Sequence, residues 1–132
     1  MLFRSDWAKK FKEQEKLKKL VDKAKEVIIV GKNTNLRMSI SGRKAENAGG
    51  EFNMPDGEVF TSVVEDSTEG EILFTYPALY QGREFHDVRL VFKKGVVVGA
   101  YASKGEKALN QILNTDPGAR RIGELEIGRA HV

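Results

Sequence analysis

Apolar residues recur every three to four positions near the start of the chain, which predicts an amphipathic helix over residues 6–24. Ser5 precedes this stretch and is of the residue type preferred at a helix N-cap. We expect the two aromatic side chains of the stripe to contact the core. The stripe consists of Trp7, Phe11, Leu17, Leu20, Val21 and Ala24.

After residue 25 the apolar spacing changes to the patterns of β-strands. Residues 26–30 are mostly apolar and residues 36–40 alternate, so the turn residues between them predict a hairpin. A second hairpin is predicted from residues 88–92 and 96–101, joined at Gly95. Residues 71–76 form a further expected strand that Pro77 ends, and the polar residues 42–52 indicate a loop.

A turn followed by an acidic residue stands in the middle of the chain. Pro55, Asp56 and Gly57 have the residue types of a tight turn, and residues 59–61 favour extended chain. Glu58 lies at the junction, where a carboxylate is held rigidly enough to be a metal ligand. The same position also suits an ordinary surface glutamate.

The last third of the chain predicts a second helix near residues 103–115. Ser103 and Glu106 have the spacing of a capping box in front of an apolar stripe. Asp116 is then expected to cap a short helix that Gly123 ends in the left-handed conformation. Glu124 follows directly, at the start of another extended run.

These elements predict an α+β fold: a bent antiparallel or mixed β-sheet, forming a partial barrel, with the two helices outside it. Residues 1–25 would be a basic amphipathic helix and residues 26–132 a β-rich part, together forming one compact domain. We find no internal repeat, phosphate loop or dinucleotide fingerprint.

Composition excludes several classes of protein. The chain has no cysteine, so disulfide frameworks, cysteine-ligated zinc fingers and cysteine hydrolases are excluded. No apolar run approaches the roughly 18 residues of a membrane span, and we expect a cytoplasmic protein. The single internal histidine, His86, is expected to be a surface or hydrogen-bonded residue rather than a metal ligand.

Positive charge is concentrated in the N-terminal helix. Residues 1–25 hold nine Lys or Arg against four Asp or Glu, a balance of +5, which leaves −2 for the rest of a chain of net charge +3. Acid-first pairs four residues apart, Asp6 with Lys10 and Glu15 with Lys19, favour a solvated helix face. A weak nucleic-acid-binding surface is the alternative.

Several sequence blocks, in one order from about residue 26 to 128, resemble the thermophilic metallo-aminopeptidase family, which includes aminopeptidases T and S. The blocks are Gly42-Arg43-Lys44, Asn53-Met54-Pro55-Asp56-Gly57-Glu58-Val59-Phe60-Thr61, Glu65-Asp66-Ser67, Gly70-Glu71-Ile72, Tyr76-Pro77-Ala78, Gly82, Leu90-Val91-Phe92, Gly95-Val96-Val97, Gly105 and Asp116-Pro117-Gly118-Ala119-Arg120-Arg121-Ile122-Gly123-Glu124.

The resemblance implies an exopeptidase that removes N-terminal residues from peptides with a pair of divalent metal ions, commonly zinc or cobalt. Glu58 and Glu124 stand where two of the family's metal ligands stand. Carboxylates are suitable ligands because they offset the charge of two ions that jointly activate water and polarise a carbonyl. No residue of this chain is assigned a proton-transfer role.

The family's other ligands, two histidines and an aspartate, and an assisting tyrosine lie further along than Val132. We therefore expect a central portion of such an enzyme, catalytically incompetent alone, with His131 not replacing a ligand. Exposed apolar surface and homo-oligomer formation are further expectations. Two alternatives remain: a non-catalytic binding or scaffolding module derived from the fold, and the nucleic-acid-binding domain described above.

Overall fold

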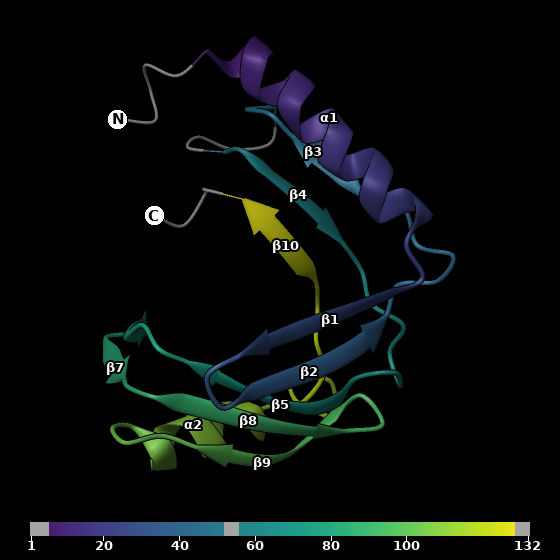
Figure 1. Cartoon of the computed structure of the whole chain (residues 1–132). Helices are drawn as coiled ribbons and strands as arrows, with labels where there is room; N and C mark the ends of the chain where they lie inside the picture. The colour runs from purple at the N-terminus through teal and green to yellow at the C-terminus, as the bar shows by residue number, and fades with distance from the viewer. Residues whose placement is uncertain (1–5, 52–55, 129–132) are drawn as a thin grey trace. The chain divides into compact units, whose positions relative to one another are not determined.

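A computed structural model describes residues 6–51 and 56–128 of the chain (Figure 1). It confirms the α+β fold, with two helices and antiparallel strands in three separate sheets rather than a closed barrel. The elements are α1 (Trp7–Lys23), β1 (Glu26–Gly31), β2 (Thr34–Ser39), β3 (Glu46–Ala48), β4 (Glu58–Thr61), β5 (Glu69–Phe74), β6 (Ala78–Tyr80), β7 (Arg83–Phe85), β8 (Val88–Lys93), β9 (Val96–Tyr101), α2 (Glu106–Leu113) and β10 (Leu125–Gly128).

The chain divides into two compact units. The first unit combines residues up to Lys25 with Ile40–Val63 and the segment from Gly123 onward. It contains α1 and the three-stranded sheet β10-β4-β3. The second unit, Glu26–Ser39 with Val64–Ile122, contains the five-stranded sheet, the β6–β7 pair and α2.

Helix α1 forms as its apolar spacing predicts, but its N-cap is Asp6. The Asp6 carboxylate accepts a hydrogen bond from the Lys9 backbone N–H at 3.0 Å, which satisfies one of the free donors of the first turn. Ser5, the expected cap, lies outside the described residues.

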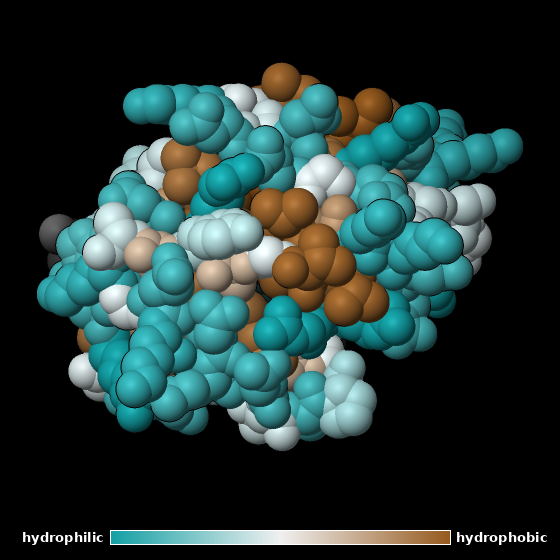
Figure 2. All heavy atoms as spheres, turned by 90° about the horizontal axis from the view of Figure 1, so that it is seen from below, coloured by the Kyte–Doolittle hydropathy of each residue, from teal (hydrophilic) through white to brown (hydrophobic). Residues whose placement is uncertain are grey.

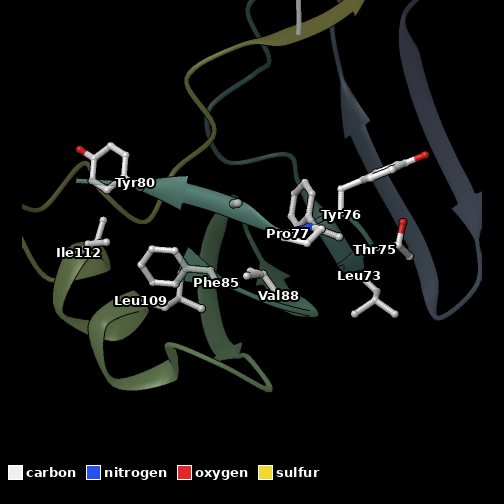
Figure 3. A pocket seen from close by; sticks show the side chains of 11 residues that line it. Leu73, Thr75, Tyr76, Pro77, Tyr80, Phe85, Val88, Leu109 and Ile112 are labelled. Carbon is white, nitrogen blue, oxygen red and sulfur yellow. The ribbon is translucent and has the colours of Figure 1, made fainter. Parts of the chain in front are cut away.

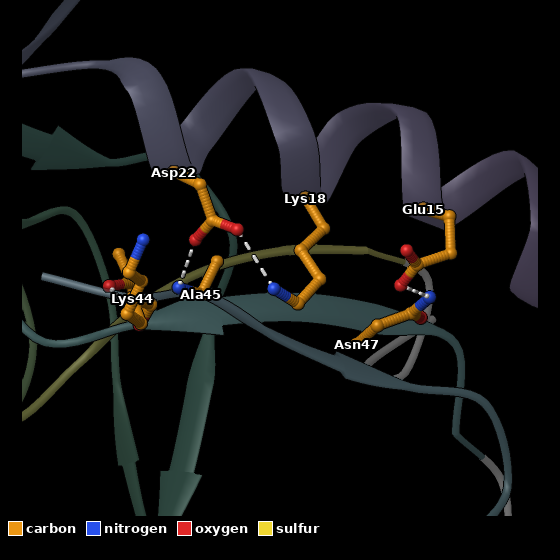
Figure 4. Close-up of polar contacts among 7 residues, drawn as sticks. Glu15, Lys18, Asp22, Lys44, Ala45 and Asn47 are labelled. Carbon is orange, nitrogen blue, oxygen red and sulfur yellow. Dashed lines mark hydrogen bonds and ion pairs between the residues drawn. The ribbon is translucent and has the colours of Figure 1, made fainter.

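Polar contacts rather than deep burial hold α1 on the sheet of the first unit, because no residue of the helix is buried. Asp22 accepts from the Ala45 N–H at 2.8 Å, and Asn47 donates to the Glu15 carboxylate at 2.9 Å (Figure 4). Lys18 pairs with Asp22 at 2.8 Å. Glu15 therefore binds β3, and Asp22 binds both the residue before β3 and Lys18 on the helix.

Three of the helix residues expected in surface ion pairs have other contacts. Asp6 is the N-cap, and the Lys10 ammonium lies 5.6 Å from the centre of the Trp7 ring. Glu15, expected to pair with Lys19, accepts the hydrogen bond from Asn47 described above. Glu15 thus binds a residue of the sheet, although the sequence pattern assigned it to the solvated face.

The five-stranded sheet of the second unit has the order β1-β2-β5-β8-β9, with every neighbour antiparallel. Both predicted hairpins, β1–β2 and β8–β9, are confirmed. Their alternation buries one face, because residues two apart on a strand point the same way. That face supplies buried side chains of Leu36, Met38, Phe92, Val97 and Ala100.

Helix α2 confirms the second predicted helix, but the capping box is wrong. Its N-cap is Gly105, with φ of 88°, and no side chain caps it. Ser103 donates instead to the Asp87 carboxylate at 2.5 Å. A side chain at residue 105 would meet the Phe85 ring at 2.7 Å, so close packing as well as backbone conformation requires glycine.

Four other local expectations need correction. The predicted loop 42–52 contains strand β3, and the strand expected to reach residue 76 ends at Phe74. Residues 117–120 form turns rather than a helix, although the Asp116 carboxylate does accept from the Gly118 and Ala119 N–H groups. Gly123 is not among the residues with positive φ. Pro55 of the predicted turn lies outside the described residues.

The β6–β7 pair was not predicted, since each strand has only three residues.

Within residues 6–51 and 56–128, neither helix combines the length and apolar character that a membrane crossing requires.

Candidate metal centre

Glu58 is the first residue of β4 and follows a buried aspartate. Asp56 has no exposed surface, and its carboxylate accepts hydrogen bonds from the Gly50 N–H at 2.6 Å and the Gly57 N–H at 2.8 Å. The Gly57 N–H also donates to the Ala48 carbonyl at 3.1 Å. The chain entering β4 is therefore fixed by backbone amides converging on one carboxylate.

Helix α1 also binds the start of β4, through the side chain of Gln14. The Gln14 side-chain amide donates to the Glu58 carbonyl at 2.8 Å and to the Ala48 carbonyl at 3.1 Å. Along β4, Val59 and Thr61 are buried while Glu58 is only half-buried. The strand alternation thus turns the Glu58 side chain away from the buried face.

Glu124 immediately precedes β10, the strand that pairs with β4. In the antiparallel register Leu125 lies opposite Thr61, and Gly128 lies opposite Glu58. Glu124 is exposed. Extending the alternation by one residue assigns Glu124 to the face of the sheet that carries Glu58, opposite the buried face.

The register also sets the separation of the two glutamates. Glu124 is four residues before Gly128, the partner of Glu58, so the two positions are about 14 Å apart along the strands at ~3.4 Å per residue. One ion would need both side chains fully extended in line, since each reaches roughly 5 Å and a metal–oxygen bond is about 2 Å. With two ions about 4 Å apart, the two side chains need not be fully extended. The spacing therefore fits ligands of different ions of a pair.

A third carboxylate lies on the same face. Glu126 is opposite Phe60, between the register positions of Glu58 and Glu124, and so is a diagonal neighbour of Glu58. No group of three or more His, Asp or Glu side chains among the described residues is arranged to hold a metal ion. The described part of the chain thus provides acidic positions on one face rather than a finished coordination sphere.

Gly128 brings β10 unusually close to the start of β4. A Cβ at this position would lie 2.6 Å from both Cα and Cβ of Glu58 and 2.6 Å from the Gly57 carbonyl oxygen. Real side chains do not approach backbone so closely, so any residue other than glycine would move Glu58. The sequence offers a weak signal for this contact, because a glycine inside a strand often marks a close approach.

His86 lies in the second unit and does not join the glutamates. Its Nε2 is 2.9 Å from the Glu84 carboxylate, which Lys104 also contacts. The Lys104 ammonium and then the His86 ring lower the pKa of Glu84. His86 is therefore a half-buried residue whose ring contacts a carboxylate of its own unit.

Sequence reasoning missed an apolar pocket in the second unit (Figure 3). It has a volume of about 620 Å³ and is formed where the ends of β5 and β8 meet α2 and the β6–β7 pair. The residues lining it include Phe74, Tyr76, Tyr80, Phe85 and Leu109. The pocket was not foreseen because it depends on the unpredicted β6–β7 pair.

Comparison with known proteins finds a metalloprotease family and several aminopeptidases that are similar to this chain. A model of the family described as thermophilic metalloprotease (M29) matches residues 4–131. Aminopeptidase 2 of Geobacillus stearothermophilus is 40% identical over 75 residues, which cover 57% of this chain and 18% of that protein. Aminopeptidase AmpS of Bacillus subtilis is 37% identical over 82 residues, covering 61% and 20%. The chain spans about a fifth of the length of these relatives.

Solved structures agree on the fold. The structure of wild-type AmpT from Thermus thermophilus has a TM-score of 0.84 and 29% identity, covering 94% of this chain and 34% of that chain. The 2,5-dihydroxypyridine dioxygenase of Pseudomonas putida KT2440 has a TM-score of 0.75 at 17% identity, covering 92% and 38%. The second likeness is one of fold alone.

Proposed function

Because the chain belongs to the thermophilic metalloprotease (M29) family, we propose that it is the part of a two-metal aminopeptidase that supplies two acidic metal ligands. The resemblance seen in the sequence blocks is confirmed at the level of the family. The metals, the peptide substrate and the removal of N-terminal residues belong to this proposal, since the chain spans about a fifth of its curated relatives.

In this proposal Glu58 and Glu124 each bind one of two divalent ions, such as zinc or cobalt. A bound pair of this kind polarises a scissile carbonyl and activates a water molecule. The role of the chain's own residues is to hold the two carboxylates at a fixed spacing. Asp56 and Gln14 do this for Glu58 through the backbone contacts described above.

One observation supports the proposal: Glu58 begins β4, and Glu124 immediately precedes β10, the strand that pairs with β4. The donor chemistry agrees, because carboxylate oxygens bind divalent cations and offset their charge. Three protein ligands are usual for each catalytic zinc ion, and residues 6–51 and 56–128 contain no group of three metal-binding side chains.

Paramagnetic broadening by Mn²⁺ tests the site on the chain itself. We expect weak binding, in the millimolar range, because two carboxylates without further ligands bind divalent ions poorly. Backbone amide signals of Phe60 and Glu126 should broaden first, since these residues lie between the two glutamates in the register. Glu58→Gln and Glu124→Gln should each reduce the broadening by at least half.

Glu69→Gln in the second unit is the matched control, because this residue is also an exposed glutamate on a strand. It should leave the broadening at Phe60 unchanged. Broadening centred elsewhere, or undiminished in both site variants, would refute the assignment of the ligands. Tight stoichiometric zinc binding would show that the site is more complete than we propose.

Hydrolysis provides a separate test. We expect no release of leucine from a leucyl substrate by the isolated chain with zinc or cobalt present, because the described residues contain no group of three metal-binding side chains. Release above the rate with metal alone, lost in Glu58→Gln, would contradict the proposed incompetence while supporting the role of the residue.

A further inference from the structure

Strand β1 is an edge of the five-stranded sheet, with β2 as its one neighbour in that sheet. Two of its outward side chains are strongly exposed, Ile28 at 55% and Val30 at 76%. Figure 2 shows that hydrophobic side chains reach the surface of the molecule elsewhere among hydrophilic ones, without assigning them to single strands. Exposed apolar edge strands are templates for pairing with another strand, and proteins usually protect them with proline or inward charge. The strand β1 has neither, since it reads Glu-Val-Ile-Ile-Val-Gly.

Backbone geometry shows which groups of β1 face the free edge. The Lys25 carbonyl accepts from the Ile40 N–H at 3.0 Å, so residue 25 directs its hydrogen-bonding groups toward the β2 side. In an antiparallel pair these directions alternate from residue to residue. The N–H and C=O groups of Glu26, Ile28 and Val30 therefore point away from β2, where a further strand would bind them.

We propose that β1 pairs with β1 of a second copy of this chain, antiparallel and centred on Ile29. In this register Ile28 lies opposite Val30 of the second copy, and Glu26 comes beside Lys32 of the second copy, the first residue of the β1–β2 turn. Each of these pairs occurs twice because the contact has two-fold symmetry. The inference concerns the edge of the sheet and does not depend on the metal centre.

Charge complementarity favours a second copy in this register. Glu26 precedes the apolar run and Lys32 follows it directly, so an antiparallel pair brings opposite charges together at both ends. Centring the pair on Ile28 would satisfy the same backbone groups, but it would place the Glu26 carboxylate opposite Val30. The register centred on Ile29 pairs apolar with apolar and acid with base throughout.

The contact is small, so we expect a weak dimer. Six residues on each side bury much less than the 1,200–2,000 Å² or so that stable interfaces bury, and a dissociation constant on the order of 0.1 mM is reasonable. Sedimentation velocity from 10 µM to 1 mM in EDTA measures it without metal. A chain that stays monomeric to 1 mM would overturn the proposal.

A charge exchange tests the register. Glu26→Lys and Lys32→Glu should each weaken association at least tenfold, because like charges then meet at both ends of the strand pair. An equimolar mixture of the two variants should restore a mixed dimer, in which opposite charges meet again. Lys32→Glu leaves the Glu26–Arg37 ion pair intact, so its loss of association cannot come from that pair. Variants that associate as well as the original chain, or a mixture that stays monomeric, would refute the proposal.

Disulfide trapping is a second test, clean because the chain has no cysteine. Ile29→Cys places two thiols opposite each other at a non-hydrogen-bonded position, where Cα atoms are about 4.5 Å apart and a disulfide can form. With oxidised glutathione as the oxidant, we expect mostly covalent dimer. Val98→Cys, 60% exposed on the opposite edge strand β9, is the control and should crosslink at least fivefold less. Equal crosslinking at both positions would overturn the assignment to β1.

Discussion

The two larger sheets of this protein are assembled in different ways. In the five-stranded sheet, β1 pairs with β2 and β8 pairs with β9, so half of its pairings are hairpins between consecutive strands. In the three-stranded sheet, β4 pairs with β3 and with β10 from the end of the chain, and α1 from its beginning packs against β3 and β4. The strands of the five-stranded sheet all come from residues 26–101, whereas the three-stranded sheet brings together segments from the middle and the end of the chain.

The difference explains where polar contacts are needed. Local hairpins align themselves through their turns and alternating side chains. Distant segments have no turn to align them, and the first unit fixes α1 against β3 and β4 with part-buried hydrogen bonds donated by the Gln14 and Asn47 side chains. The proposed metal ligands lie in this second kind of sheet. Their positions should therefore respond to changes that the hairpin sheet tolerates.

The largest effect is expected from Asp56→Ala in the first unit. The Gly50 N–H loses its acceptor, while the Gly57 N–H keeps its bond to Ala48. Burial of an unsatisfied donor and loss of a charged acceptor should lower the free energy of unfolding by about 2–3 kcal/mol. Urea denaturation followed by Trp7, the single tryptophan and a residue of α1, measures it.

Asp116→Ala in the second unit is the matched control. The Asp116 carboxylate also accepts from two backbone N–H groups, those of Gly118 and Ala119, but it is exposed to water. We expect a loss of about 0.5–1 kcal/mol, since solvent replaces the acceptor. Equal losses at the two aspartates would remove the distinction drawn between the units.

A smaller effect is expected from Gly128→Ala, because its Cβ would lie 2.6 Å from Cα of Glu58. The strands must separate, at a cost of about 1–2 kcal/mol. The same shift should weaken Mn²⁺ broadening at Phe60. Gly31→Ala on β1 has its nearest neighbour 3.9 Å away and should leave the stability of the second unit within about 0.5 kcal/mol. Normal metal broadening in Gly128→Ala would show that this close approach does not position Glu58.

The smallest effect concerns acid stability and Asp22. The Ala45 N–H, and then Lys18, lower the pKa of Asp22 below its usual 3.8. A lowered pKa contributes stability above about pH 4 that is lost as the pH falls through the native value. The stability difference between the original chain and Asp22→Asn should therefore shrink as the pH is lowered from 5 toward 2. Trp7 fluorescence in urea measures this difference.

Glu26→Gln is the corresponding variant in the second unit, where the Arg37 guanidinium lowers the pKa of Glu26. This pair is more exposed, so we expect a weaker pH dependence, measured by amide exchange of β2. A pH dependence as large as that of Asp22 would indicate that the two kinds of contact are equivalent.

The sequence predicts more of the second unit, with its two hairpins, than of the first unit. The β1–β2 and β8–β9 hairpins follow from alternation and turn residues that lie within about 15 residues of each other. Strand β3 was hidden in a polar stretch, because its three residues form a strand only by pairing with β4. The capping box failed because Ser103 has a closer acceptor in Asp87, which the sequence does not place beside it.

The sequence alone determined the helix periodicity, the two hairpins, the family and the identity of Glu58 and Glu124 as candidate ligands, because each depends on residue types at short spacings or in matched blocks. Only the tertiary structure decided that these glutamates share one sheet face at opposite ends of a strand pair, with Gly128 in contact with Glu58. Strand register between distant segments is set by packing and hydrogen bonds across the fold, and no local pattern specifies it.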